Sequence, residues 1–179
     1  MKLIYISMIR IISLALPVIM FSILFIGCTD DRASKPIPSA NWAKRVVNEV
    51  NKDSLQFGKS YLSIYSLIYS ETEHRTHNLT VMVSLRNTSD KDTIYLENSH
   101  YFDTNGNLVR SYHEDIIYLA PMETIEIIID ELDISGGTGS NFIFDWYASK
   151  TCPEPIFEAV MNSTMARGIS FTTTAKRIE

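Results

Sequence analysis

The chain has 179 residues, of which 45% are hydrophobic, and its 21 acidic side chains outnumber its 16 basic ones to give a formal net charge of −5. This length fits one domain together with terminal segments. The acidic balance argues against a nucleic-acid-binding protein and against electrostatic attachment to anionic lipid.

The first 28 residues have the layout of a bacterial lipoprotein signal. Lys2 and Arg10 form a basic start, an apolar run follows over residues 11–26, and Gly27 with Cys28 supplies the small residue and the thiol at which such signals are cleaved and lipidated. We therefore expect residues 1–27 to be a signal peptide. Cys28 is expected to carry several acyl chains, palmitate among them, which hold a protein to a membrane better than one chain does.

An uncleaved membrane anchor is the alternative interpretation of this segment. Residues 11–27 number 17 and include Pro17, whereas a spanning helix needs about 20 apolar residues. Phe25 is less usual than leucine at three residues before the cysteine. Both interpretations place the rest of the chain outside the cytoplasm, because basic residues hold the N-terminus inside.

The residues directly after Cys28 indicate the final location of the protein. Asp30 and Asp31 resemble the acidic export tag of surface lipoproteins in some Gram-negative bacteria. The outer membrane or the cell surface is therefore the expected location.

Residues 28–58 are expected to hold the lipidated cysteine, a tether and a short segment before the domain. Residues 29–40 contain two prolines, two serines and mixed charge, a composition typical of a linker. Over residues 41–53, apolar side chains recur near helical spacing from Trp42 onward. This pattern fits either a short helix or an irregular segment that Trp42 packs against the domain.

Residues 59–179 are expected to form one domain of strands. Apolar and polar residues alternate with period two in most of this region, as in half-buried strands. Seven to nine short strands with turn residues between them, and no long helix, predict an antiparallel β-sandwich. The expected strands lie at residues 61–66, 79–86, 93–102, 108–112, 116–119, 125–130, 142–147, 155–161 and 169–174.

The cysteines and histidines give no strong site. With Cys28 lipidated, Cys152 is the single remaining thiol, so no internal disulfide is expected. Cys152 lies in a proline-bounded loop without a histidine nearby in the sequence, so a structural role is favoured over a nucleophile. His100 and His113 flank a turn and are weak candidates for a metal site, and no metal is expected.

Two other histidines, His74 and His77, are three residues apart in a polar segment. On a helix they would share a face, but here they are interpreted as solvated residues of a connection between two strands. A copper electron-transfer site is excluded because no histidine follows Cys152.

Residues 103–107 alternate oxygen-bearing side chains before Gly106, like the start of a calcium loop. Tyr112 stands where the EF-hand type needs a glutamate, so the match fails. A hairpin turn closed by Asp103, with Gly106 at positive φ, explains the same residues.

A glycine-rich loop over residues 135–141 holds three of the seven glycines. It lacks the lysine of a phosphate-binding loop and leads into a strand, so a turn or bulge is favoured. Glycine also allows a ligand or partner to approach the backbone closely. If the protein has a binding site, we expect it at Ser135, Gly136, Gly137, Gly139 and Asn141.

No serine–histidine–acid order, nucleophile elbow or paired-carboxylate motif is present, so we expect neither an enzyme nor a bound cofactor. A hydrolase would need a nucleophile–base pair that the sequence does not display.

Several groups of residues between 61 and 178 together resemble DUF3124, a bacterial family of unknown function. This resemblance implies a secreted or lipid-anchored protein and assigns no catalytic residues. Residues 86–89 also resemble a strand end in immunoglobulin-like domains, which gives an immunoglobulin-like β-sandwich as the expected fold. The residues that carry the family resemblance are 65–69, 79–81, 85–88, 101–103, 106, 108–112, 135–137, 139, 141–142, 158–161 and 168–171.

Together these features predict a lipid-anchored extracytoplasmic envelope protein. It is expected to attach to the membrane through Cys28 and to act as a non-catalytic interaction or structural module that contacts envelope proteins. The alternative is a small-ligand or metal-binding domain that uses the glycine-rich loop with His100 and His113.

Overall fold

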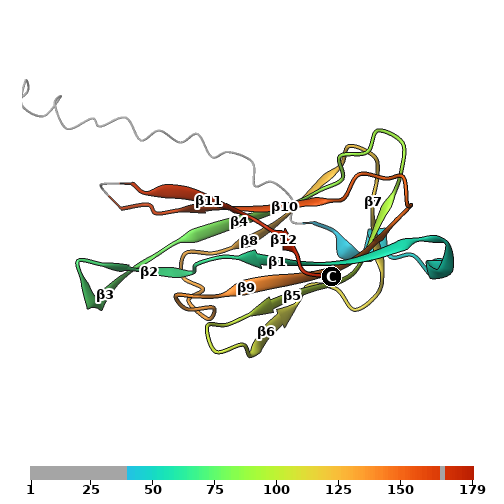
Figure 1. Ribbon diagram of the computed structural model, residues 1–179. Helices are drawn as coiled ribbons and strands as arrows, with labels where there is room; N and C mark the ends of the chain where they lie inside the picture. Colours follow the sequence, from blue (N-terminus) through green and yellow to red (C-terminus); the bar gives the residue numbers. More distant parts are fainter. Residues whose placement is uncertain (1–39, 166–167) are drawn as a thin grey trace, which may run out of the picture. The chain divides into compact units, whose positions relative to one another are not determined.

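Two antiparallel β-sheets face each other in the part of the chain that the computed structural model describes, residues 40–165 and 168–179 (Figure 1). These residues fall in one compact unit, Pro38–Glu179. The prediction of an all-β antiparallel sandwich is confirmed. The predicted signal peptide, Cys28 and the tether up to residue 39 lie outside the described residues.

The larger sheet has the strand order β12-β1-β9-β5-β6, and β7 pairs with β5. The smaller sheet has the order β11-β10-β4-β8, and a separate hairpin of β2 and β3 extends away from the sandwich (Figure 1). The strands are β1 (Gln56–Ser63), β2 (Leu67–Ser70), β3 (Thr72–Asn78), β4 (Thr80–Arg86), β5 (Ile94–Phe102), β6 (Leu108–Ser111), β7 (Ile117–Leu119), β8 (Thr124–Ile129), β9 (Asn141–Ala148), β10 (Ile156–Asn162), β11 (Ser170–Thr174) and β12 (Lys176–Arg177).

The described residues contain these twelve strands rather than seven to nine. β2, β3 and β12 were not predicted, and for β3 the cause is clear. Residues 72–78 form β3 although their side chains are mostly exposed. A strand with both faces in water has no apolar alternation, and alternation is the pattern from which strands are predicted. His74 and His77 therefore lie on a strand and not in an irregular connection.

The segment before β1 contains two short 3-10 helices, η1 (Trp42–Arg45) and η2 (Lys52–Ser54). Asn41 caps η1 by accepting a hydrogen bond from the Lys44 N–H at 3.3 Å. Of the two predicted alternatives, the irregular segment packed by Trp42 is therefore closer to the structure. In residues 40–165 and 168–179 we find no helix that is long and apolar enough to cross a membrane.

Stacked aromatic rings fill the centre of the sandwich. The Phe142 ring lies 5.1 Å from Tyr101 and 5.3 Å from Phe144, and Phe144 lies 4.3 Å from Phe157. Because these residues come from β5, β9 and β10, the stack connects both sheets. All four side chains are buried, so the stack forms the centre of the core.

Trp146 fits into the core because its strand neighbour is Gly58. The two residues face each other between β9 and β1, and a Cβ on Gly58 would lie 2.2 Å from Trp146 Cζ2. The indole N–H donates to Ser60 Oγ at 3.0 Å, which satisfies its one buried donor.

Candidate functional site

The glycine-rich loop connects β8 to β9, so it crosses from the smaller sheet to the larger one. Its backbone is bonded to the turn between β5 and β6. Thr104 donates to the Gly136 carbonyl through both its N–H and its hydroxyl, each at 3.0 Å. Its hydroxyl oxygen also accepts from the Gly139 N–H at 2.9 Å.

The loop is bonded on its other side to the segment that follows β1. The Gly137 carbonyl accepts from the N–H groups of Ser66 and Leu67, each at 3.2 Å. Gly137 has φ +73°, a conformation that glycine adopts without strain. The carbonyl oxygens of Gly136 and Gly137 thus already serve the protein's own donors.

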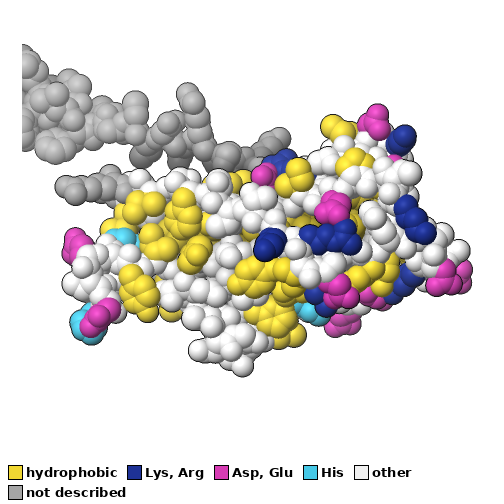
Figure 2. Space-filling view, in the orientation of Figure 1, with side chains coloured by type: hydrophobic (Ala, Val, Ile, Leu, Met, Phe, Trp, Pro, Cys, Tyr) yellow, Lys and Arg dark blue, Asp and Glu magenta, His cyan; other side chains and the backbone are white. Residues whose placement is uncertain are grey.

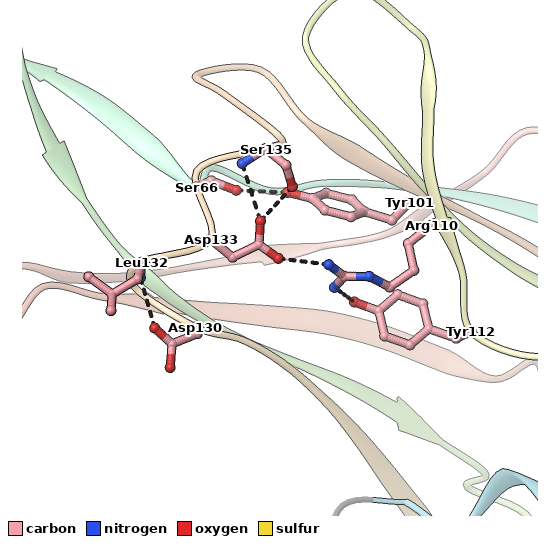
Figure 3. A network of polar contacts seen from close by, with 8 residues as sticks. All are labelled: Ser66, Tyr101, Arg110, Tyr112, Asp130, Leu132, Asp133 and Ser135. Atoms are coloured by element: carbon pink, nitrogen blue, oxygen red, sulfur yellow. Dashed lines mark hydrogen bonds and ion pairs between the residues drawn. The ribbon is translucent and has the colours of Figure 1, made fainter.

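Gly136 lies directly against the side chain of Tyr101. A Cβ at residue 136 would be 1.8 Å from the Tyr101 hydroxyl oxygen and 2.8 Å from Ser140 Cβ. The hydroxyl also forms a buried hydrogen bond of 2.7 Å with Ser66 Oγ (Figure 3). Packing against Tyr101 therefore accounts for this glycine without a bound ligand.

Asp133 fixes the first half of the loop (Figure 3). Its Oδ1 accepts from the hydroxyl and the N–H of Ser135 at 2.5 and 3.2 Å, and its Oδ2 accepts from Arg110 Nη2 at 2.9 Å. These contacts, the Ser135 hydroxyl first, lower the pKa of Asp133. Arg110 also donates to the Tyr112 hydroxyl at 3.2 Å. The network ties β6 to the β8–β9 loop.

Leu132 is held outward by a second carboxylate. Asp130 Oδ1 accepts from the Leu132 N–H at 2.8 Å, and the Asp130 carbonyl accepts from the Asp133 N–H at 2.9 Å. This turn leaves the Leu132 side chain 85% exposed and pointing away from the polar network (Figure 3). The turn thus leaves an apolar side chain in water.

The two histidines named as weak metal candidates have different surroundings. His113 is buried, its Nδ1 lies 2.9 Å from the Asp115 carbonyl, and its Nε2 lies 2.9 Å from Ser99 Oγ. A carbonyl can only accept, so Nδ1 carries the proton and Nε2 accepts from the serine. His100 lies on β5 with its ring edge against Phe102.

Both ring nitrogens of His113 are therefore engaged within the protein. Desolvation lowers the pKa of His113, so the neutral form is favoured. Within the described parts of the chain, no three His, Cys, Asp or Glu side chains are grouped so that they could hold a metal ion.

A shallow depression of about 500 Å³ lies beside His113. The Trp42 ring stacks on His113 at 5.7 Å and forms part of its wall. The depression is lined by Trp42, Ala43, Val46, Asn48, His113, Glu114 and Asp115.

The turn after β5 has the predicted form. Asp103 Oδ1 accepts from the N–H groups of Asn105 and Asn107, each at 2.8 Å, and Gly106 has φ +83°. A hydrogen bond from the Asn107 side chain lowers the pKa of Asp103 most, and the backbone bonds lower it further. The prediction of a turn closed by Asp103 is confirmed.

Cys152 is a free and buried thiol. Burial raises its pKa, and a raised pKa reduces the fraction of the reactive thiolate. This environment is typical of a structural cysteine.

Three features of this region were not predicted: the Arg110–Asp133 pair, the exposed Leu132, and the bonds of Thr104 to the glycine loop. The spacing Asp130-x-Leu132 and Asp133-x-Ser135 could have indicated two consecutive turns with side-chain caps. The long-range partners, Thr104 and Arg110, leave no local pattern in the sequence.

Comparisons with known proteins place the chain in a family. Residues 58–178 match the family described as protein of unknown function, DUF3124. No curated protein matches the chain. Among solved structures, the crystal structure of Thermotoga maritima 1070 is similar over 66% of this chain and 92% of that chain, with 12% sequence identity and a TM-score of 0.43. Because the family match covers more than half of the sequence, the chain belongs to the DUF3124 family.

Proposed function

We propose that this protein is a lipid-anchored envelope protein and that its exported β-sandwich is a non-catalytic interaction module. Lipid on Cys28 holds it to the membrane, at the outer membrane or the cell surface. The family assignment supplies no activity, so the proposal depends on the signal-like N-terminus and on the chemistry of the domain.

One observation carries the interaction role: the connection between β8 and β9, residues 130–140, uses two of its backbone carbonyls within the protein and leaves the side chains of Leu132 and Ile134 exposed. The carbonyls of Gly136 and Gly137 accept hydrogen bonds from the protein itself, whereas Leu132 is 85% exposed. A loop that cradles a small ligand would leave backbone groups free for it. Exposed apolar side chains two residues apart, such as Leu132 and Ile134, instead suit contact with another protein.

The anchor is tested by metabolic labelling with palmitate in cells that express the full chain or its Cys28→Ser variant. We expect label and membrane fractionation for the native chain, and loss of the label in the variant. A Cys152→Ser variant is the matched control, because it removes a buried cysteine that lies far from the signal in the sequence. Labelling that persists in Cys28→Ser would contradict lipidation at this residue.

The location is tested separately with Asp30→Ala and Asp31→Ala together. If the two aspartates direct surface display, the double variant stays lipidated but loses labelling by a membrane-impermeant reagent. Unchanged surface labelling would remove the export role of these residues and leave the anchor itself intact.

The interaction role is tested by cross-linking intact cells and recovering the full chain through a C-terminal tag. One or two enriched envelope proteins, or a second copy of the chain, would support it, provided that Leu132→Asp reduces the yield. If the native protein forms no cross-linked species through any of its surfaces, the small-ligand alternative would be favoured instead. A rise in melting temperature with zinc or copper would then be the expected sign of that alternative.

A further inference from the structure

The shallow depression beside His113 combines aromatic and acidic walls. On one side lie Trp42 and Val46, which belong to the segment before β1. On the other side lie Glu114 and Asp115, which belong to the connection between β6 and β7. No lysine or arginine of the described residues lines it. The depression therefore offers apolar contact area together with negative charge.

The two carboxylates are available for an external cation. Glu114 and Asp115 are exposed, and the ion pairs among the described residues involve other carboxylates. Asp115 contacts His113 through its backbone carbonyl, not through its side chain. Its carboxylate is therefore not needed to hold the imidazole ring.

The inner wall of the depression supplies no positive charge of its own. His113 donates from Nδ1 to the Asp115 carbonyl and accepts at Nε2 from Ser99, each at 2.9 Å. Desolvation lowers the pKa of His113, so the neutral form of its ring is favoured. The same ring supports Trp42, which stacks on it at 5.7 Å with 28° between the ring planes. The indole is thus held in place beside the two carboxylates.

Arginine is the side chain that matches this combination best. Its planar guanidinium stacks on aromatic rings, and its fork of N–H donors binds a carboxylate through two hydrogen bonds. A small-molecule site normally encloses most of its ligand, whereas this depression is open to solvent. An open depression with an aromatic wall instead suits a side chain that projects from another protein.

A second cavity, of about 530 Å³, lacks this unbalanced charge. It lies between the β2–β3 hairpin and the connection from β10 to β11. Figure 2 shows that apolar and acidic side chains gather at this end of the domain too. Here, however, Arg75 lines the cavity and forms an ion pair of 2.8 Å with Glu71. Charge complementarity therefore favours the depression beside His113 as a docking site for a cation.

We infer that the depression beside His113 receives an arginine side chain of a partner envelope protein. The guanidinium stacks on Trp42 and donates to the carboxylates of Glu114 and Asp115. The inference rests on the proposed interaction role and adds a recognition site to it, because none of the lining residues belongs to the β8–β9 connection. It does not depend on the lipid anchor.

Intrinsic fluorescence of the full chain in detergent tests the site. The chain has two tryptophans, and Trp146 is buried in the core, so ligand-dependent changes report on Trp42. The probes are N-acetyl-arginine amide and N-acetyl-citrulline amide, which share their shape but differ in charge. We expect saturable binding of the arginine probe with a dissociation constant of about 1–10 mM, because a probe of this size makes few contacts. The citrulline probe should bind about tenfold more weakly or worse.

Charge removal then tests the acidic wall. Glu114→Gln together with Asp115→Asn keeps the shape of two exposed side chains, and we expect this double variant to bind the arginine probe about fivefold more weakly or worse at an unchanged melting temperature. Glu71→Gln together with Glu73→Gln, at the β2–β3 hairpin, is the matched control and should bind as the native chain does. An arginine probe that fails to saturate up to about 50 mM overturns the inference. Equal binding of the two probes, or native-like binding by the first double variant, also overturns it.

Cross-linking in intact cells separates this inference from the proposed function. We expect Glu114→Lys to lower the yield of a cross-linked envelope protein about fivefold or more, whereas Glu73→Lys leaves it unchanged. If the yield depends on Leu132 but not on Glu114, the inference fails and the interaction role stands. If the arginine probe binds but no protein is cross-linked, the ligand is a free guanidinium compound, and both the partner inference and the interaction role fail.

Discussion

At the scale of single residues, the glycine loop is shaped by the space that side chains need. Gly136 and Gly139 lie in the same loop, but their surroundings differ. A Cβ at Gly136 meets the Tyr101 hydroxyl at 1.8 Å, whereas a Cβ at Gly139 meets Thr104 Cγ2 at 3.3 Å. The first contact requires movement of a buried ring, and the second requires a shift of a few tenths of an ångström.

We therefore predict that Gly136→Ala lowers the free energy of unfolding by about 3 kcal/mol through overpacking. Gly139→Ala, the matched control, should lower it by less than about 1 kcal/mol. Chemical denaturation checks both values. In a Tyr101→Phe background, which removes the hydroxyl, Gly136→Ala should cost less than in the native background. Equal costs in the two backgrounds would show that the Tyr101 hydroxyl is not the obstacle.

His113 gives the protein a pH dependence whose sign follows from its burial. Trp42 covers the ring, Ser99 and the Asp115 carbonyl bond to it, and His100 opposes its protonation electrostatically. Its folded-state pKa is lowered, so the unfolded chain binds more protons as pH falls below about 6.5. The stability that His113 contributes is thus fully present above that pH and is lost below it.

We predict that the native protein loses stability between pH 7.5 and pH 5.5 and that His113→Gln reduces this loss. Glutamine keeps a donor and an acceptor but does not titrate in this range. The range lies above that in which carboxylates with lowered pKa, such as Asp133, would contribute. Denaturation midpoints at both pH values provide the measurement. An identical slope in native and variant proteins would contradict the assigned role.

At the scale of elements, separate connections are held together by a few buried polar groups. Asn87, at the end of β4, donates to the carbonyls of Asp92, Leu119 and Ala120 at 2.8–3.1 Å, and its Oδ1 accepts from the Ser89 N–H at 2.9 Å. One side chain thus joins the β4–β5 connection to the turn between β7 and β8.

Asn87→Asp keeps the shape of this side chain but replaces the donor with an oxygen that faces carbonyl oxygens. We predict a loss of about 3 kcal/mol in the free energy of unfolding. Asn51→Asp, at an exposed residue without a side-chain cap, is the control and should change stability by less than about 0.5 kcal/mol. A similar effect of the two substitutions in thermal or urea denaturation would rule out the bridging role.

The segment before β1 is a structural part of the sandwich. Arg45 forms an ion pair of 2.7 Å with Glu123, the Val47 N–H donates to the Ile116 carbonyl at 2.8 Å, and Trp42 covers His113. In the sequence, this segment follows directly after the predicted tether.

Removing the Trp42 ring should therefore have two effects. We predict that Trp42→Ala lowers the free energy of unfolding by about 2 kcal/mol through lost apolar burial. It should also raise the pKa of His113 toward its ordinary value, because the ring is hydrated. NMR titration of the imidazole measures the second effect. Val50→Ala, on the same segment but outside the depression beside His113, should leave that pKa unchanged; equal pKa shifts in the two variants would contradict a specific cover.

At the scale of the whole molecule, the proposed lipid anchor would hold every copy of the domain at one membrane surface. Proteins held in one membrane are concentrated in two dimensions, which favours contacts that are weak in dilute solution. The exposed side chains of Leu132 and Ile134 would then be presented to neighbouring proteins of the same membrane.

The sequence by itself determined the all-β class, the family and the turn closed by Asp103. Each of these depends on local information: period-two alternation, side chains that cap nearby N–H groups, or short motifs. The two faces of β3 are both polar, so the same reasoning missed that strand. The signal peptide and Cys28 remain predictions from the sequence.

Only the tertiary structure decided how the candidate site is used. Thr104, Ser66 and Tyr101 are distant from the glycine loop in the sequence. Thr104 and Ser66 nevertheless donate hydrogen bonds to its carbonyl groups, and the Tyr101 side chain fills the space beside Gly136. The strand order, which leaves β8 at an edge between Met122 and Leu132, was equally inaccessible. Pairing order and long-range packing arise from contacts between segments far apart in the chain, and local periodicity does not encode which segments meet.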